Sequence, residues 1–232
     1  MIGGRVIAAL LAALMLGACS PQAPSAPPPP AESQPHRQGV PVNHLFAADA
    51  NLVRKAVEAG ADLETRDDRG RTPLLVAVTE DRVEVAEILV KAGADPNALD
   101  GRHDTPWLVT GVTGSVPMAK VLLAAKPDLT ITNRFGGVSV IPASERGHVE
   151  YVRLVAKSGI DVDHVNDLGW TALLEAVILG DGGPRHQEVV RALVAAGADV
   201  DLADKEGVTP LAHARSKGQT AVARILREAG AH

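Results

Sequence analysis

A three-residue segment recurs along this chain at an almost constant spacing, and this repetition limits the folds that the chain can adopt. Its clearest form is Gly-Ala-Asp, and the other copies are Lys-Pro-Asp, Gly-Ile-Asp and Gly-Ala-His. The six copies begin at residues 60, 93, 126, 159, 197 and 230, so the spacings are 33, 33, 33, 38 and 33 residues. A period of this length means that each unit buries its apolar side against its neighbours. The sequence therefore predicts a solenoid.

A second recurring feature marks where helices begin. Thr-Pro occurs at residues 72–73, 105–106 and 209–210, and Thr-Ala occurs at 171–172. A threonine hydroxyl can accept a hydrogen bond from a free N–H of the first turn, and proline at the first helical position sacrifices no hydrogen bond. About twenty residues later, the glycine of Gly-Ala-Asp can end a second helix in the left-handed conformation. Each unit is thus predicted to hold two helices joined by a short turn.

These segments carry a family resemblance. Thr-Pro-Leu at 72–74, Gly-His-Val-Glu at 147–150 and Gly-Ala-Asp-Val-Asp at 197–201 resemble the ankyrin repeat, over roughly residues 43–232. The run from Arg134 to Ala176 is similar to a group of small bacterial ankyrin proteins. The resemblance implies an all-α repeat solenoid of about six helix-turn-helix pairs with β-hairpin loops. It also implies a scaffold that binds a protein partner of unknown identity.

The chain divides into six predicted units, numbered one to six here. They span residues 43–66, 67–99, 100–132, 133–165, 166–203 and 204–232. Units one and six are expected to cap the array, since end units of a solenoid need a polar outer side. Unit five carries five additional residues within 181–187. We expect them to form a surface turn ahead of a second helix that begins near Glu188.

Two units depart from the pattern. Unit three ends in Lys126 rather than glycine, so we expect its junction with unit four to be less regular. Unit four has Val138-Ser139 in place of Thr-Pro. If its helix starts one residue late, Ser139 becomes the N-cap and Pro142 the third helical residue, where an N–H has no partner inside the helix.

The N-terminus is typical of a secreted bacterial lipoprotein. Arg5 precedes an apolar run, Val6 to Leu16, that is too short to span a bilayer and suits a signal peptide. The following Leu-Gly-Ala-Cys resembles a lipobox, which implies cleavage after residue 18 and a lipid on Cys19, the only cysteine. Residues 19–42, rich in proline and alanine, are predicted to be an extended tether. An ordinary signal peptide is the alternative.

The predicted location follows from this N-terminus. A lipid on Cys19 would hold the chain on a membrane of the bacterial envelope, facing the periplasm. Ser20 follows the cysteine, and in such lipoproteins a residue other than aspartate there favours the outer membrane over the inner one.

Charge and composition argue against several functions. Removing residues 1–18 leaves 22 basic residues against 28 acidic ones, a formal charge of −6, which does not suit nucleic acid. Hydrophobic residues make up 46% of the chain but aromatic ones only 2%, so we expect an aliphatic core without a deep cofactor pocket. The sequence has no nucleophile elbow, phosphate-binding glycine loop or metal-ligand spacing. We predict no catalytic residues, no metal and no cofactor.

Partner-binding residues are predicted on the hairpin tips and the exposed side of each first helix. Phe135, Leu168 and Trp170 come from adjacent units and could form an exposed apolar cluster. Alternatively, Trp170 covers the next hairpin. A basic strip lies beside them, made of Arg69, Arg71, Arg102 and Arg134. It could pair with carboxylates of a partner or be a solvated face. Arg185 and His186 of the insertion complete the candidates.

Three functions are compatible with these residues. The chain could recruit or stabilise another envelope protein, it could neutralise a toxic effector as an immunity protein, or it could self-associate through the apolar cluster. We expect a monomer that binds a protein partner, and not an enzyme.

Overall fold

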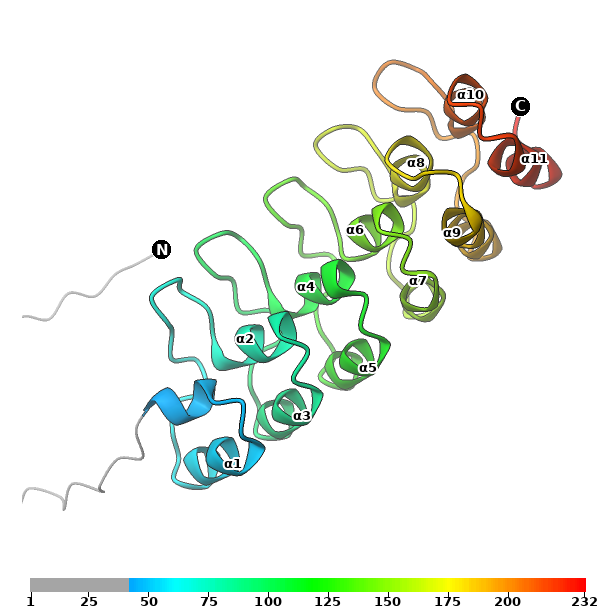
Figure 1. Cartoon of the computed structure of the whole chain (residues 1–232). Coiled ribbons are helices and arrows are strands. Elements are labelled where there is room, and N and C mark those ends of the chain that lie inside the picture. Colours follow the sequence, from blue (N-terminus) through cyan, green and yellow to red (C-terminus); the bar gives the residue numbers. More distant parts are fainter. Residues whose placement is uncertain (1–41) are drawn as a thin grey trace, which may run out of the picture. The chain divides into compact units, whose positions relative to one another are not determined.

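The structure is a computed structural model that describes residues 42–232 (Figure 1). The predicted signal peptide, the lipidation site Cys19 and all but the last residue of the predicted tether lie outside the described residues.

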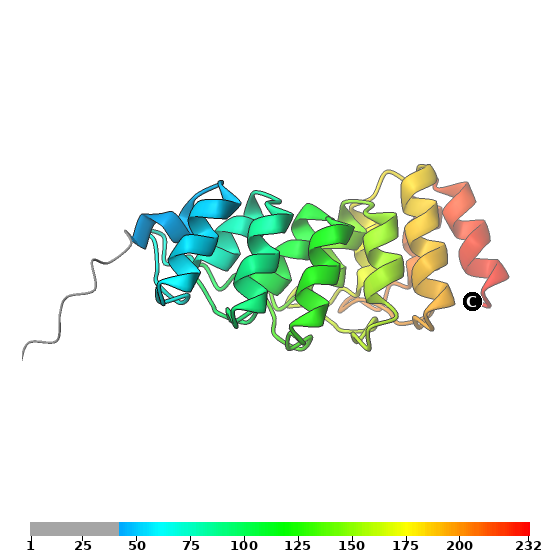
Figure 2. The same cartoon turned by 90° about the horizontal axis from the view of Figure 1, so that it is seen from below.

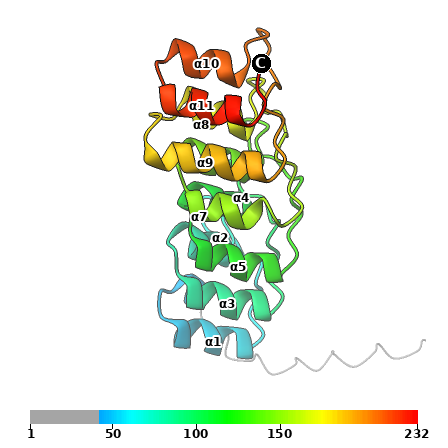
Figure 3. The same ribbon diagram turned by 90° about the vertical axis from the view of Figure 1, so that its right-hand side faces the viewer.

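The described residues form two rows of helices, and each repeat contributes one helix to each row (Figures 1 and 3). The inner row consists of α2 (Pro73–Thr79), α4 (Pro106–Thr113), α6 (Val140–Glu145), α8 (Ala172–Ile178) and α10 (Pro210–Ser216). The outer row consists of α1 (Ala50–Glu58), α3 (Val83–Lys91), α5 (Val116–Ala124), α7 (Val149–Val155), α9 (Pro184–Ala195) and α11 (Thr220–Glu228), which lie side by side in Figure 2. In unit one a short 3-10 helix, η1 (Val42–Phe46), takes the inner position.

Helices contact their counterparts in the next unit, α2 with α4 and α3 with α5 for example. No β-strand occurs between residues 42 and 232, and the loops that join the units are hairpin-shaped turns (Figure 1). The prediction of an all-α solenoid of stacked helix pairs is therefore confirmed, although the expected β-hairpin loops contain no strands.

The threonines cap the inner helices as expected. Thr72, Thr105 and Thr171 each accept a hydrogen bond on Oγ1 from the N–H three residues later, at 3.2, 3.1 and 3.2 Å. In unit four, Ser139 does precede the helix and Pro142 is its third residue, but the Ser139 hydroxyl makes no capping bond. Its backbone already has helical torsion angles, which turn the side chain away from the first-turn N–H groups.

The core between the two rows is aliphatic, apart from two aromatic side chains. Trp107 and Tyr151 are both fully buried, and the Tyr151 hydroxyl lies 2.7 Å from Thr110 Oγ1. Burial raises the pKa of Tyr151 to about 12, so the phenol stays neutral. Each buried leucine in this core contributes roughly 2 kcal/mol, and the contribution depends on the neighbouring unit being present.

Polar side chains also hold each unit to the one before it. The residue just ahead of an outer helix bonds a carbonyl near the end of the preceding inner element. Arg82 donates to Phe46 O at 2.9 Å, His148 Nε2 to Val112 O at 3.2 Å, and Gln219 Nε2 to Val177 O at 3.0 Å. These bonds fix the register between units where apolar packing alone has no direction.

The insertion in unit five differs from its prediction. Helix α9 begins at Pro184 rather than near Glu188, and it has 12 residues where α3 and α5 have nine. Gly183 and Pro184 supply a helix start, since proline suits the first helical position. Part of the insertion is therefore helix, and the surface turn is shorter than expected.

The junction after unit three is also more regular than expected. Helix α5 has nine residues, like α3. Lys126 takes the left-handed conformation that glycine has elsewhere, with φ of 54°, and its N–H donates to Leu123 O at 3.1 Å. The same geometry is reached with a side chain that does not favour it.

Substitutions at the ends of α5 and α9 test the energetic cost of the left-handed conformation of Lys126. Lys126→Gly should raise the free energy of unfolding by about 0.5 kcal/mol, because relief of left-handed strain exceeds the entropy that glycine adds to the unfolded chain. Gly197→Lys should lower it by about 1 kcal/mol, since Gly197 has φ of 92° and open space where a Cβ would lie. Urea unfolding would measure both, and destabilisation by Lys126→Gly would contradict the assignment.

Candidate functional site: a groove along the hairpin tips

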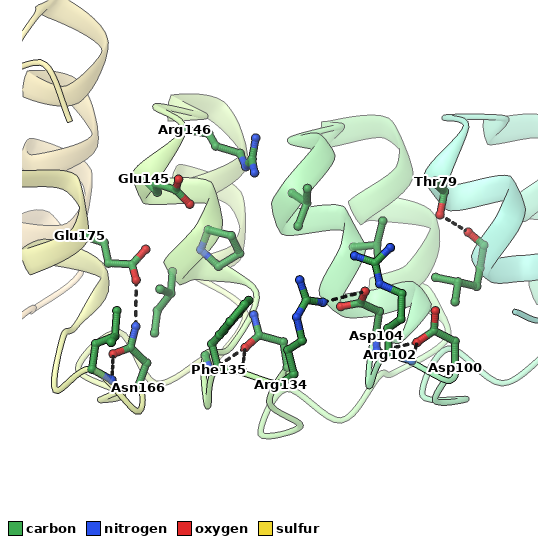
Figure 4. A pocket seen from close by; sticks show the side chains of 18 of the residues that line it. Thr79, Asp100, Arg102, Asp104, Arg134, Phe135, Glu145, Arg146, Asn166 and Glu175 are labelled. Carbon is green, nitrogen blue, oxygen red and sulfur yellow. Dashed lines mark hydrogen bonds and ion pairs between the residues drawn. The ribbon is translucent and has the colours of Figure 1, made fainter. Parts of the chain in front are cut away.

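A groove of about 560 Å³ runs along units two to five, between the hairpin tips and the inner helices (Figure 4). The inner helices and the residues that end them form one wall. They contribute Leu75, Thr79, Val109, Val112, Ile141, Pro142, Glu145, Arg146, Glu175 and Leu179. The hairpins contribute Arg69, Arg71, Asp100, Arg102, Asp104, Asn133, Arg134, Phe135, Gly137, Asn166 and Leu168. The groove is thus a product of stacking, because no single unit supplies its walls.

The hairpins have one geometry, set by the Asp or Asn at their start. In unit four, Asn133 Oδ1 accepts the N–H groups of Phe135 and Gly137 at 2.9 and 3.0 Å. In unit five, Asn166 Oδ1 accepts those of Leu168 and Trp170, both at 3.0 Å. Residues two positions after the Asp or Asn therefore lie at equivalent places on successive tips. Those residues are Arg69, Arg102, Phe135, Leu168 and Glu206.

The four predicted arginines all line the groove, but two of them already contact side chains of this chain. Arg71 Nε donates to Asp67 Oδ2 at 2.8 Å. The Arg134 guanidinium lies 4.5 Å from the centre of the Phe135 ring and 3.7 Å from Asp104 Oδ2. Arg69 and Arg102 are exposed, and among residues 42–232 neither forms an ion pair. Arg146, which also lines the groove, is likewise exposed and forms no ion pair among these residues, so these three guanidinium groups are the most available to a carboxylate.

The middle of the groove is apolar. Phe135 and Leu168 are 56% and 55% exposed, and their hairpins are joined by a hydrogen bond from Asp167 N to Phe135 O at 3.0 Å. Val112 and Leu179, on the inner-helix side, are 41% and 50% exposed. Half-exposed apolar side chains gathered in one groove are unusual on a surface that faces only water.

Trp170 does not join this cluster. It is half-buried and lies outside the lining of the groove. It lies four residues after Asn166, and its N–H donates to Asn166 Oδ1 at 3.0 Å. The expected cluster of three therefore reduces to Phe135 and Leu168, with Val112 and Leu179 as companions that the sequence pattern did not indicate.

One buried acidic residue of the groove was not predicted from the sequence. Glu175 of α8 is only 7% exposed, and its Oε1 accepts a hydrogen bond from Asn166 Nδ2 at 2.8 Å (Figure 4). Burial, with the charge of Glu145 as a smaller cause, raises the pKa of Glu175 to about 7. At the equivalent position, units three and four have Val109 and Pro142. A comparison of that one position along the repeats could have identified Glu175.

His186 requires a correction. It was predicted on the exposed surface of the insertion, but it is 8% exposed, and both ring nitrogens face acceptors of this chain. Nδ1 lies 2.7 Å from Asp181 Oδ1, and Nε2 lies 2.9 Å from Glu145 O. Hydrogen bonds from Gly183 N and from His186 hold the pKa of Asp181 below its usual range. His186 thus joins unit five to unit four, as His148 joins units four and three, while its neighbour Arg185 is exposed.

Two features are absent from the part of the chain that the structure describes. Residues 42–232 contain no group of three or more His, Cys, Asp or Glu side chains arranged to hold a metal ion. They also contain no helix long and apolar enough to cross a bilayer.

The geometry defines a class of protein: stacked helix pairs whose hairpin tips and inner helices form one groove. A family model described as an ankyrin repeat matches residues 69–101. A second model, described as three copies of ankyrin repeats, matches residues 107–204 and 143–232. The chain is 38% identical over 198 residues to the ankyrin repeat protein YahD of Escherichia coli strain K12, covering 84% of this chain and 98% of YahD. The protein belongs to the ankyrin repeat family.

Solved structures agree. An ankyrin repeat domain from Acinetobacter baumannii AYE has 43% identity and a TM-score of 0.76, covering 82% of this chain and 99% of that domain. The ankyrin repeat protein EF0377 has 36% identity and a TM-score of 0.77, covering 81% and 98%. The ankyrin domain of Bcl-3, a member of the IkappaB family, has 25% identity and a TM-score of 0.75, covering 85% and 88%. Ankyrin repeats generally bind proteins and are generally not enzymes.

Glu175→Gln should change stability in a pH-dependent way. Because the folded-state pKa is raised to about 7 from 4.5, the wild type binds more protons folded than unfolded between these values. Its stability therefore falls as pH rises through this window. The free energy of unfolding of the variant should exceed that of the wild type by about 2 kcal/mol at pH 8, and the two should be almost equal at pH 4.5. Urea unfolding at both pH values measures this, with exposed Glu206→Gln as the control. An equal gain at both would contradict the burial argument.

His186→Ala should lower the free energy of unfolding by about 1–2 kcal/mol, because it removes the hydrogen bond to Glu145 O that joins unit five to unit four and the contact with Asp181 within the insertion. Arg185→Ala, one residue away and exposed, should change it by less than about 0.5 kcal/mol. Thermal or urea unfolding of the two variants makes the comparison. If His186→Ala were as mild as Arg185→Ala, His186 would not be a structural residue.

Proposed function

We propose that this protein binds another protein through the groove of units two to five and acts as a scaffold that recruits or stabilises it. The observation that carries the proposal is the strip of Phe135, Leu168, Val112 and Leu179, all 41–56% exposed within one groove. A partner that covers this strip removes apolar surface from water, and the unpaired guanidinium of Arg102 at its edge can receive a carboxylate.

A protein surface fits this groove better than the other ligand classes. The groove is open and extends over four units, which suits a loop or an extended segment rather than an enclosed small molecule. The predicted mature chain has a formal charge of −6, which opposes the phosphates of nucleic acid. Buried aromatic anchors dominate the energy of such interfaces, and Phe135 is placed to be one.

We also propose that the protein is lipid-anchored in the bacterial envelope and faces the periplasm. Support comes from the sequence alone: the apolar run Val6 to Leu16 and the Leu-Gly-Ala-Cys segment that ends at Cys19. A tether of 22 residues from Ser20 to Pro41 could reach about 70 Å at polyproline spacing. Such a tether would let the groove meet partners well away from the membrane.

The groove proposal is tested by affinity purification with cross-linking from the native envelope. The wild type is compared with a Phe135→Ala, Arg102→Glu double variant. Lys120→Glu, an exposed change on the outer helix α5, is the control. We expect one protein to be captured by the wild type and by Lys120→Glu and to be lost from the double variant, with a loss of affinity of about 30-fold or more. Unchanged circular dichroism melts would show that all three are folded.

The captured protein also decides among the roles. A housekeeping envelope protein fits the scaffold, a toxic hydrolase fits an immunity protein, and the chain itself fits self-association. Equal capture by the double variant and the wild type would contradict the groove as the binding site.

The anchoring proposal is tested by Cys19→Ser. We expect the wild type to sediment with membranes and to show the mass of a lipid-modified N-terminal cysteine, and the variant to lose both properties. Mass spectrometry of the purified chain and membrane fractionation provide the readouts. A wild-type N-terminus cleaved elsewhere, with an unmodified Cys19, would show an ordinary signal peptide instead.

A further inference from the structure

One position on the hairpin tips changes its chemistry steadily along the array. It is the residue two places after each hairpin's first Asp or Asn. It is basic in units two and three, as Arg69 and Arg102, apolar in units four and five, as Phe135 and Leu168, and acidic in unit six, as Glu206. Since the hairpins share one geometry, these side chains occupy successive places along one line. The line runs from positive through apolar to negative.

The acidic residues that the inner helices place in the groove lie in units four and five. Glu175 of α8 and Glu145 of α6 are close enough that the charge of Glu145 disfavours ionisation of Glu175. The carboxyl of Glu175 has one hydrogen-bonding side chain among the described residues, Asn166, which carries no charge. A buried carboxylate with only a neutral partner is costly, and a cation brought to it would offset that cost.

The other charges around Glu175 do not supply this cation. Arg146 follows Glu145 in sequence, but Figure 4 shows its guanidinium pointing away from Glu175, toward unit three. No ion pair joins Glu175 or Glu145 to a basic residue within residues 42–232. The acidic end of the groove therefore lacks a counter-charge from this chain, while the opposite end has the unpaired guanidinium groups of Arg69 and Arg102.

We propose that the partner presents a segment of opposite polarity: a carboxylate that meets Arg69 or Arg102, apolar side chains over Phe135 and Leu168, and a lysine or arginine that enters beside Glu175 and Glu145. This inference rests on the proposed function and specifies its partner. Neighbouring helices in a stack lie about 10 Å apart, so units three and five are offset by about 20 Å along the array. An extended chain covers that distance in about six residues.

The test uses a display library of random twelve-residue peptides, selected on the immobilised full-length protein. We expect the selected peptides to share an acidic residue and a lysine or arginine about six positions apart, with apolar residues between them. The best peptide is then synthesised with its basic residue intact and with that residue replaced by glutamine. Both forms are titrated against the wild type, Glu175→Gln, Arg102→Gln and the outer-helix control Lys120→Glu.

Glu175→Gln is a sharp probe because glutamine keeps an oxygen for Asn166 and removes only the charge. It should lower affinity for the intact peptide about tenfold. Replacing the peptide's basic residue should cost about tenfold with the wild type and almost nothing with Glu175→Gln, as a double-mutant cycle requires for a direct pair. Arg102→Gln should weaken both peptides equally, and Lys120→Glu neither.

Each other result has a definite meaning. The selected peptides could lose affinity with Arg102→Gln but bind Glu175→Gln and the wild type equally. That result would contradict the proposed polarity of the bound segment and would still support binding in the groove. If all four proteins bind the peptides equally, or if the wild type selects none, both the polarity and the proposed groove function are contradicted. A wild-type dimer that all groove variants abolish would make a second copy the occupant and would overturn the inference.

Discussion

The hydrogen bonds made by the first Asp or Asn of each hairpin are the constraint on which the rest of the site depends. In units two to six this side chain accepts two backbone N–H groups, from the second and fourth residues that follow it. The turn is therefore the same in every unit, whatever its other side chains are. That sameness places Arg102, Phe135 and Leu168 on one line and makes a groove out of separate loops.

Stacking adds the second wall. The inner helices lie next to one another because each buries its apolar side against the next unit, and Arg82, His148 and Gln219 bond the carbonyls of the preceding unit. Their exposed sides then form the wall that carries Val112 and Leu179. Function in this protein resides in side chains that the fold does not need, which is why the fold alone names no partner.

Much of the fold could be predicted from the sequence, because its signals are local. Thr72 and Thr105 mark helix starts, and the glycine of Gly-Ala-Asp marks helix ends. Features without such a signal could not be predicted. Lys126 takes a left-handed conformation that its residue type does not favour. The helical part of the insertion did have a signal, Gly183-Pro184, but it differs from the Thr-Pro that marks the other helix starts.

The site was less predictable than the fold. The tip residues Phe135 and Leu168 were identified because hydrophobic side chains in a polar turn are conspicuous. Trp170 looked equivalent to them, but it lies two residues further on in its hairpin, is half-buried and does not line the groove. His186 looked exposed because its contact with the Glu145 carbonyl exists only once unit five packs on unit four.

The central claim is that a partner protein occupies the groove, and photo-cross-linking in living cells tests it most directly. A photoreactive amino acid is placed at Val112, in the groove, and in a second strain at Lys120, on the outer helix α5. The account requires one dominant cross-linked protein from position 112 that is absent from position 120. Cross-links from position 120 with none from position 112 would place recognition on the other side of the array and contradict the account.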